Sequence, residues 1–131
     1  MDDGGRAGSG DRDSARGLTA SQRAIMIVRL WRGRARAESA DAYQRHVTTN
    51  VFPKLERLYG FIRGRVLRRR VDDQVEFLVM TEWASLDAVR AFAGDELDRA
   101  IVEPAARLVL ADFDTHVEHF EVVQESSDPR M

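Results

Sequence analysis

The stretch Gln74–Gly94, QVEFLVMTEWASLDAVRAFAG, decides the fold because it predicts a buried strand that runs directly into a helix. Side chains alternate across a strand. One face of this strand therefore carries Val75, Phe77, Val79, Thr81 and Trp83, and the other carries Glu76, Leu78, Met80 and Glu82. Ser85 is placed to cap the helix, and Gly94 is placed to end it. The expected buried stripe of the helix consists of Leu86, Val89 and Phe92.

The composition limits the classes of protein to which the chain can belong. With 131 residues, of which 44% are hydrophobic, a single small domain is expected. The formal net charge of -2 argues against a general nucleic-acid-binding protein. The absence of Cys excludes disulfides, thiolate nucleophiles and Cys-ligated metals. No membrane helix or signal peptide is expected, so we predict a cytoplasmic protein without a membrane or nucleic-acid partner.

Changes in composition predict the domain boundaries. Residues 1–22 are rich in Gly, Ser, Asp and Arg, which predicts a disordered N-terminal tail. Residues 23–124 contain every segment with strand or helix periodicity and form the expected domain. Residues 125–131 are polar and predict a flexible C-terminal tail.

Three more strands and a long helix complete the predicted domain. They are a strand over Ile25–Arg32, a helix over Ser39–Leu58 that breaks near Pro53, a strand over Gly60–Val71 and a last strand over Asp112–Val123. Two short helical segments, over Asp95–Val102 and from Pro104, are expected before the last strand. The residues that these two segments are expected to bury are Leu97, Ile101, Ala105, Leu108 and Val109.

The order of these elements, βαββαβ, predicts an α+β protein with a ferredoxin-like fold. Its four-stranded antiparallel sheet would carry both main helices on one face. The other face still presents apolar residues such as Leu78 and Met80, so we expect a homodimer in which a second copy covers it. Arginines of the second predicted strand are expected to pair with Glu76 and Glu82 across the sheet.

Three segments of the chain resemble the antibiotic biosynthesis monooxygenase family: residues 27–34 (IVRLWRGR), 76–94 (EFLVMTEWASLDAVRAFAG) and 117–123 (VEHFEVV). The most specific part is the T-x-W-x-S pattern of Thr81–Ser85. The resemblance covers nearly all of residues 24–123. It implies a dimeric α+β barrel, in which two sheets pack through their open faces. It also implies a pocket between each sheet and its own helices, lined by Trp83.

The resemblance implies one of two reactions. Some members of the family oxygenate phenolic polyketide rings with dioxygen and no metal, flavin or haem, whereas others bind haem and open its ring. The haem-degrading type uses an asparagine in the first strand and a histidine in the second helix. Ile25–Arg32 contains no Asn and Leu86–Gly94 contains no His. The resemblance therefore favours a cofactor-independent monooxygenase acting on a small aromatic or polyketide-like molecule.

Two histidines are the candidate catalytic residues, because a cofactor-free oxygenase needs a base and neutral His suits this role at pH 7. His46 lies one helical turn from Tyr43, so it is placed to reach the pocket. His119 shares a face of the last predicted strand with Phe113 and Val117. His116 lies on the opposite face, so His116 and His119 cannot chelate one metal, and no metal site is expected.

Four residues are candidates for binding the substrate. Trp83 would form an aromatic wall, Tyr43 would hydrogen-bond a substrate oxygen, and Arg29 would hold a phenolate or carboxylate. Arg99 corresponds, by the resemblance, to an arginine that holds substrate in the oxygenase type. Each has a structural alternative: Trp83 and Tyr43 as core residues, and Arg29 in a salt bridge with Glu82 or Glu118.

A second function remains open alongside the oxygenase. The asparagine that precedes the tryptophan in the oxygenase type is missing here, and Val79 stands nearest that place. This absence favours a non-catalytic dimeric barrel that binds a small ligand or a partner protein. Binding of single-stranded RNA is disfavoured, because the open sheet face lacks an aromatic stacking platform.

Overall fold

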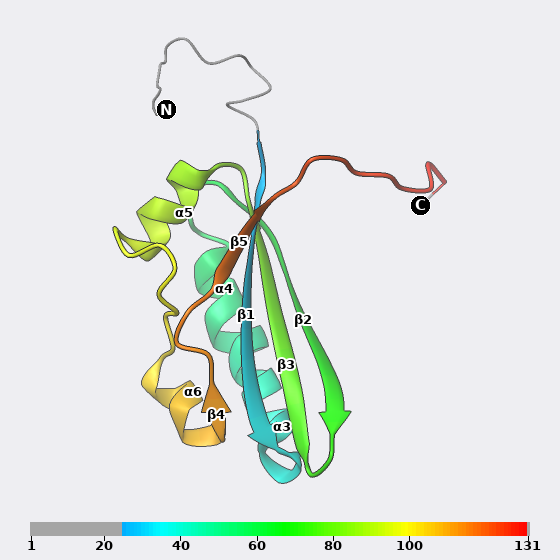
Figure 1. Ribbon diagram of the computed structural model, residues 1–131, viewed down its shortest axis with the longest axis vertical. Coiled ribbons are helices and arrows are strands. Elements are labelled where there is room, and N and C mark those ends of the chain that lie inside the picture. Colours follow the sequence, from blue (N-terminus) through cyan, green and yellow to red (C-terminus); the bar gives the residue numbers. More distant parts are fainter. Residues whose placement is uncertain (1–24, 131) are drawn as a thin grey trace.

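The computed structural model describes residues 25–130 as an antiparallel sheet with helices on one face (Figure 1). Its strands are β1 (Ile27–Arg36), β2 (Phe61–Val71), β3 (Gln74–Trp83), β4 (Asp112–Phe113) and β5 (Glu118–Glu121). Its helical segments are η2 (Ala37–Ser39), α3 (Ala40–His46), η3 (Val47–Val51), α4 (Phe52–Leu55), α5 (Leu86–Ala93) and α6 (Pro104–Val109). The predicted tail over residues 1–22 lies outside the described residues. Within residues 25–130, no helix has the length and apolar character needed to cross a membrane.

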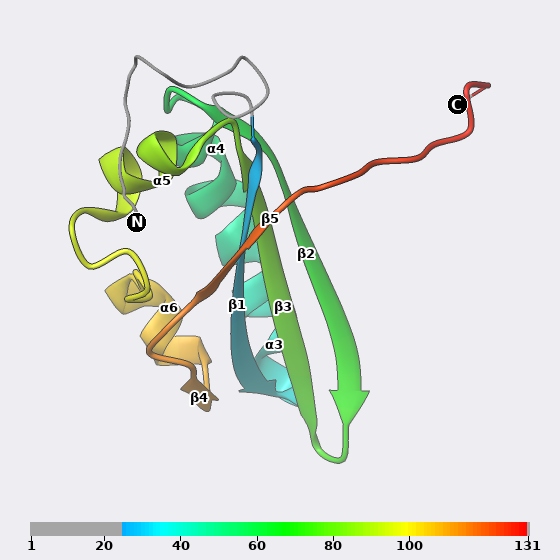
Figure 2. The same cartoon turned by 45° about the horizontal axis from the view of Figure 1, so that its top comes forward.

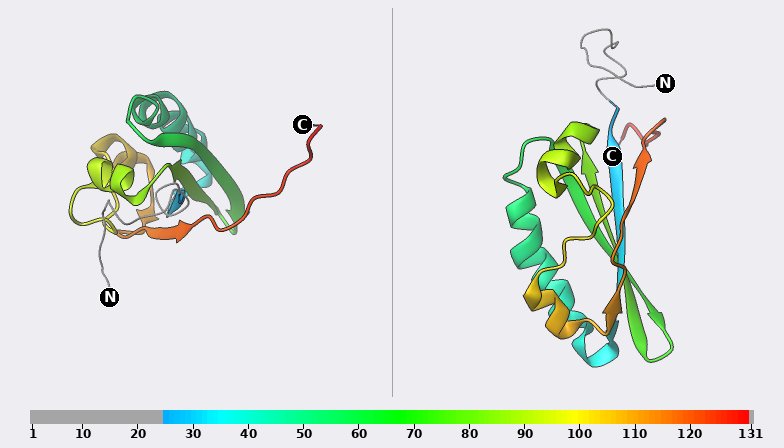
Figure 3. Two further views of the ribbon diagram at one scale, coloured as in Figure 1. Left: turned by 90° about the horizontal axis from the view of Figure 1, so that it is seen from above. Right: turned by 60° about the vertical axis from the view of Figure 1, so that its left-hand side comes forward.

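The strands follow the order β2-β3-β1, and β4 and β5 both pair with the remaining edge of β1. β1 and β3 pair along their whole length, from Ile27 opposite Trp83 to Arg36 opposite Gln74. Figures 2 and 3 show the helices on one side of this sheet and no helix on the other. This arrangement confirms the predicted α+β, ferredoxin-like fold.

The organising strand and helix also form as predicted. Along β3, residues of the predicted inner face are the more buried ones. Ser85 caps α5 by accepting the backbone N–H of Ala88 at 3.1 Å, and Gly94 ends it with a φ of 83°, which glycine adopts without strain. One detail is wrong: Leu86 is exposed, because the buried stripe of α5 runs through Ala88 and Val89.

The first helix is continuous where the sequence predicts a break. The five residues of η3 form a π-helical turn between α3 and α4, so the chain passes Pro53 without leaving the helix. Pro53 is the second residue of α4, the helix that directly follows the π-helical turn. The predicted capping by the Ser39 side chain is also wrong, since η2 precedes α3 and Ser39 makes no side-chain cap bond.

The last predicted strand is divided into β4 and β5. Residues between them hydrogen-bond elsewhere: Ala100 N donates to Thr115 O, and Val117 N donates to Asp98 O. The predicted helical segment over Asp95–Val102 is a series of turns for the same reason. Helix α6 begins at Pro104 as predicted. Its buried residue is Ala106, whereas Ala105, Leu108 and the preceding Ile101 are exposed.

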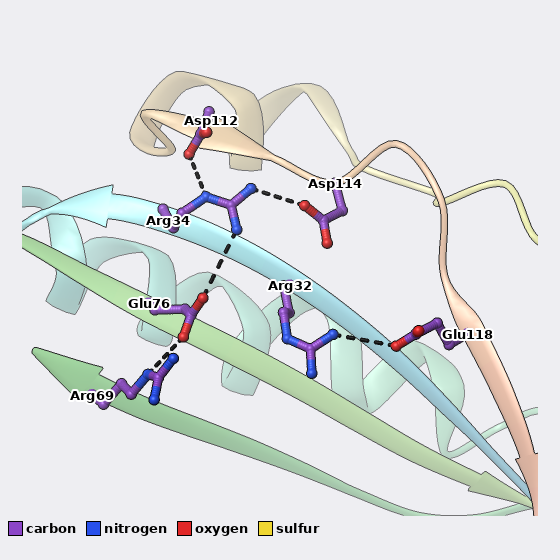
Figure 4. Close-up of polar contacts among 7 residues, drawn as sticks. All are labelled: Arg32, Arg34, Arg69, Glu76, Asp112, Asp114 and Glu118. Carbon is purple, nitrogen blue, oxygen red and sulfur yellow. Dashed lines mark hydrogen bonds and ion pairs between the residues drawn. The ribbon is translucent and has the colours of Figure 1, made fainter. Parts of the chain in front are cut away.

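The face of the sheet without helices carries a ladder of ion pairs (Figure 4). Arg34 bonds Asp112 at 2.7 Å and Asp114 at 2.9 Å, and Arg69 bonds Glu76 at 2.7 Å. Arg63 bonds Glu82 at 2.8 Å, so both predicted cross-strand acceptors are paired with arginines of β2. A bulge between Phe61 and Arg63 moves Phe61 to the helical side, although the sequence placed both on one face.

Candidate functional site

A cavity of about 220 Å³ lies between the inner face of the sheet and the helices. β1 and β3 contribute one side, and α3, η3 and α4 contribute another, with Phe92 and residues 101–106 completing the lining. Most lining side chains are apolar or aromatic. The polar ones are Arg29, Tyr43, His46, Lys54, Thr81 and Glu103. An apolar cavity with a few polar groups is the usual form of a small-molecule site.

Arg29 is the buried cation of this cavity. It lies on the inner face of β1, opposite Thr81 of β3, and is only 6% exposed. Its Nη1 donates to the Leu97 carbonyl oxygen at 2.7 Å, and its Nη2 donates to the Arg99 carbonyl oxygen at 3.1 Å. The ring of Phe92 lies 5.5 Å from the guanidinium carbon. These contacts fix the guanidinium beside the cavity.

Within residues 25–130, no carboxylate is bonded to Arg29 to balance its charge. The sequence left open a salt bridge with Glu82 or Glu118, but each of these pairs with another arginine on the open face of the sheet. Burial lowers the pKa of Arg29 to about 10, and the charge of Asp98 acts in the opposite direction. The guanidinium therefore remains protonated at neutral pH.

His119 lies behind Arg29 and does not line the cavity. It sits on β5 opposite Arg29, with Nε2 2.9 Å from Arg29 Nη1 and Nδ1 3.2 Å from Asp98 Oδ1. A guanidinium only donates, so Nε2 accepts from Arg29 and Nδ1–H donates to Asp98. His119 was expected from the sequence as a catalytic base, but the structure places it to position Arg29.

Protonation of His119 should weaken the folded protein at acidic pH. Burial, and secondly the charge of Arg29, lower the pKa of His119 in the folded state. The unfolded chain, with a histidine pKa near 6.5, then binds more protons. The free energy of unfolding should therefore fall as pH drops below about 6.5. Urea unfolding at several pH values should show a shallower fall for His119→Gln, and equal slopes would contradict this role.

His46 lies on the cavity at the end of α3 and is 8% exposed. Its Nδ1 is 3.2 Å from Asn50 Nδ2, and its Nε2 is 3.3 Å from Glu103 Oε1. The contact with Glu103 does not have hydrogen-bond geometry, so Nε2 is a buried polar atom without a hydrogen-bond partner in the described chain. Glu103 instead bonds Lys54 at 2.8 Å. A buried nitrogen without a hydrogen bond needs an explanation, and a catalytic role or a bound water are two such explanations.

Tyr43 and Trp31 form the aromatic part of the cavity near His46. The Tyr43 ring lies 6.3 Å from that of His46 and 6.2 Å from that of Trp31. Burial raises the pKa of Tyr43, so its hydroxyl remains a donor at neutral pH. Trp31 donates its Nε1–H to the Asp114 carbonyl oxygen at 2.7 Å, and it lies over Gly33, where a Cβ would be 2.5 Å from the indole.

Trp83 lies one layer deeper than expected. It is fully buried and is not among the lining residues, so it does not form the predicted pocket wall. Its Nε1 donates to Thr81 Oγ1 at 3.0 Å, and its ring stacks on Phe92 with centroids 5.2 Å apart. Thr81 and Phe92 do line the cavity. Trp83 therefore supports two lining residues from behind.

Arg99 is the candidate that the structure separates from the others. Its side chain is exposed and bonds Glu96 at 2.8 Å on the surface. Only its backbone reaches the site, through the carbonyl oxygen that accepts from Arg29. Of the six residues expected from the sequence, the cavity thus brings together Arg29, Tyr43 and His46.

Residues 26–104 match the sequence pattern of the antibiotic biosynthesis monooxygenase family. The chain belongs to this family. The matched region extends from the start of β1 to the first residue of α6 and so includes Arg29, Tyr43, His46 and Glu103. No curated protein is significantly similar to the chain in sequence.

Solved structures share the fold of this family member. A proposed antibiotic biosynthesis monooxygenase from Bacillus cereus has a TM-score of 0.53 at 17% identity, over 79% of this chain and 99% of its own. The heme-degrading protein Rv3592 from Mycobacterium tuberculosis has a TM-score of 0.53 at 22% identity, over 80% of this chain and 99% of its own. A mutant of SnoaB, a cofactor-independent oxygenase from Streptomyces nogalater, has a TM-score of 0.50 at 20% identity, over 79% and 97%.

The residues of the cavity do not fit haem. A volume of about 220 Å³ is below the roughly 300–1,000 Å³ of pockets for drug-sized ligands, and haem is larger than most such ligands. By the resemblance, the haem-degrading type also needs an iron-ligating histidine in the second helix, but α5 contains no histidine. The nearest alternative, His46 Nε2, is buried beside Glu103. Within residues 25–130, no group of three metal-binding side chains is placed to hold an ion.

Trp31, Phe92 and Glu103 are among the lining residues that were not identified from the sequence as part of the site. Trp31 shares a strand face with Arg29, so alternation along β1 could have revealed it. Phe92 lay on the predicted stripe of α5 and was assigned to the core alone. Glu103 carries no local signal, because its position depends on the irregular path of residues 95–103.

Proposed function

We propose that the protein is a cofactor-independent monooxygenase that oxygenates a small aromatic compound in the cavity between its sheet and helices. The observation that carries this proposal is an apolar and aromatic cavity whose lining places the rings of His46 and Tyr43 side by side. Membership of the antibiotic biosynthesis monooxygenase family supports the class of reaction. The volume suits a compound of one or two rings, since a cavity of about 150 Å³ holds benzene.

In this mechanism His46 removes a proton from the substrate, and the anion that remains is electron-rich. This role requires Nδ1–H on the far side of the ring. The Asn50 amide accepts this proton once it is turned so that its oxygen, and not the Nδ2 that lies 3.2 Å from Nδ1, faces the imidazole. Glu103, 3.3 Å from Nε2, stabilises the imidazolium that forms. The protonated hydroxyl of Tyr43 donates to the oxygen anion created on the substrate.

The deprotonated substrate then supplies the electrons for its own oxygenation. It transfers one electron to dioxygen, and the resulting pair of radicals combines to a peroxide on the ring carbon. Loss of water from the peroxide leaves a carbonyl group. A ring CH₂ and one O₂ thus become C=O and H₂O, with the proton held by His46 returned to the departing oxygen. The apolar lining keeps bulk water away from the peroxide.

Oxygen uptake with purified protein and a panel of one- and two-ring phenols and quinols tests this function. His46→Gln should lower the rate about 10²–10⁴-fold, the usual contribution of a general base. His116→Gln is the matched control, because His116 is an exposed histidine away from the cavity. Equal rates for both variants would contradict the role of His46. Ligand binding without oxygen uptake would instead favour the non-catalytic barrel.

We also propose that the protein acts as a homodimer through the face of its sheet that carries no helix. Along this face Leu67 is 44% exposed and Phe120 is 52% exposed, and the neighbouring Leu30, Leu78 and Met80 are only partly covered. A contiguous apolar strip flanked by charged residues is typical of a protein interface. The ion pairs of Figure 4 would form its polar rim.

A further inference from the structure

Arg29 is a buried cation whose hydrogen-bonding capacity is only partly used. A guanidinium has five N–H groups. In the described chain, Nη1 uses both of its hydrogens, on Leu97 O and His119 Nε2, and Nη2 uses one, on Arg99 O. The N–H of Nε and the second N–H of Nη2 have no acceptor among residues 25–130. Two neighbouring donors remain for a ligand.

The partners of Arg29 orient it without neutralising it. Two are backbone carbonyl oxygens and the third is a neutral histidine nitrogen, so no anion bonds the guanidinium within the described residues. Asp98 is the nearest acidic influence, and it is engaged with His119. A buried charge without a counter-ion is costly unless the site gains one. The cavity that Arg29 lines is where a ligand could supply it.

We propose that the ligand of this cavity is a one- or two-ring aromatic compound with a carboxylate that binds Arg29. A carboxylate supplies two acceptor oxygens, which match two neighbouring N–H donors of a guanidinium. Phe92, stacked against the guanidinium, and Val79 provide apolar contacts for a ring beside it. The inference rests on the proposed function in taking the same cavity as the substrate site.

The carboxylate is distinct from the oxygen that becomes charged during the reaction. In the proposed mechanism that charge develops beside His46 and Tyr43, on the helical side of the cavity. Arg29 is already charged before any substrate proton is removed, so it requires an anion that the ligand brings with it. A phenol that ionises only at the base would leave Arg29 unbalanced on binding.

Isothermal titration calorimetry of the full chain with matched ligand pairs tests this inference. The probes are benzoate, 4-hydroxybenzoate and 2-naphthoate, each compared with its carboxamide, which has the same shape without the charge. At least one carboxylate should bind tenfold or more tightly than its amide. Arg29→Met should abolish that preference. Arg99→Gln removes an exposed arginine side chain but keeps the backbone carbonyl that accepts from Arg29, so this variant should retain the preference.

The inference is overturned if no carboxylate is preferred over its amide, or if Arg29→Met keeps the preference. The comparison of ligands on the unaltered protein does not depend on the folding of any variant. Oxygen uptake with neutral substrates and no carboxylate preference would refute the inference and leave the proposed function standing. A carboxylate preference without oxygen uptake from any bound ligand would refute the proposed function and leave the inference standing.

Discussion

Replacing Trp83 with alanine is expected to lower the free energy of unfolding by about 3–5 kcal/mol, as for other large buried aromatic residues. The side chain is 0% exposed and stacks on Phe92, while Phe61 meets it edge-on with ring centroids 5.4 Å apart. Its removal would leave a cavity beneath the wall of the site. It would also free the hydroxyl of Thr81 from its indole partner. A loss of this size is a large part of the stability of a small domain.

Urea unfolding followed by circular dichroism measures this effect. The matched control is Trp31→Ala, because Trp31 is the second of the two tryptophans and borders the cavity directly. We expect the Trp31 variant to lose less stability and to show the larger change in ligand affinity. If the free energy of unfolding of Trp83→Ala instead lies within about 1 kcal/mol of that of the unaltered protein, the assignment of Trp83 as a core residue is wrong.

Replacing Leu67 with glutamate is expected to convert a dimer into a monomer. Leu67 lies on β2 opposite Leu78 of β3, in the apolar strip that a second copy is proposed to cover. Transfer of a carboxylate into an apolar interface costs several kcal/mol, and each 1.4 kcal/mol raises the dissociation constant tenfold. In the monomer the same side chain is 44% exposed, so folding should be little affected.

Light scattering coupled to size-exclusion chromatography gives the mass directly. The control is Leu108→Glu on α6, where the leucine is 87% exposed and lies away from the open face. That variant should keep the dimer mass. A monomer mass for the unaltered protein would refute the proposed dimer. An unchanged dimer for Leu67→Glu would place the interface elsewhere.

Elements with a strong local pattern were predictable from the sequence. Alternation along β3 identified its inner face, and Ser85 and Gly94 marked the ends of α5, because these signals depend only on neighbours along the chain. The path after α5 was not predictable in the same way. Residues 98–100 form backbone hydrogen bonds with the chain between β4 and β5, and no local sequence pattern in either segment predicts this pairing.

The same contrast between local pattern and tertiary packing applies to the candidate site. Tyr43 and His46 were identified because helix periodicity places them one turn apart, and Arg29 was identified on the condition that its strand face meets the pocket. His119 lies on the same side of the sheet as Arg29, but the length of Arg29 places its guanidinium between the imidazole and the cavity. Trp83 lies on the predicted face too, yet Phe92 and Thr81 cover it. The direction in which a side chain points is a local property, whereas its distance from the cavity depends on which other side chains pack between them.

The sequence by itself determined the α+β class, the order of strands and helices along the chain, and which residues of a strand share a face. These features follow from periodicities of about two and 3.6 residues and from capping residues, all of which act over a few neighbouring positions. Only the tertiary structure decided which candidates border the cavity, and it showed that no anion is bonded to Arg29 among residues 25–130. Those outcomes depend on contacts between residues as far apart as Arg29 and His119, which local pattern does not encode.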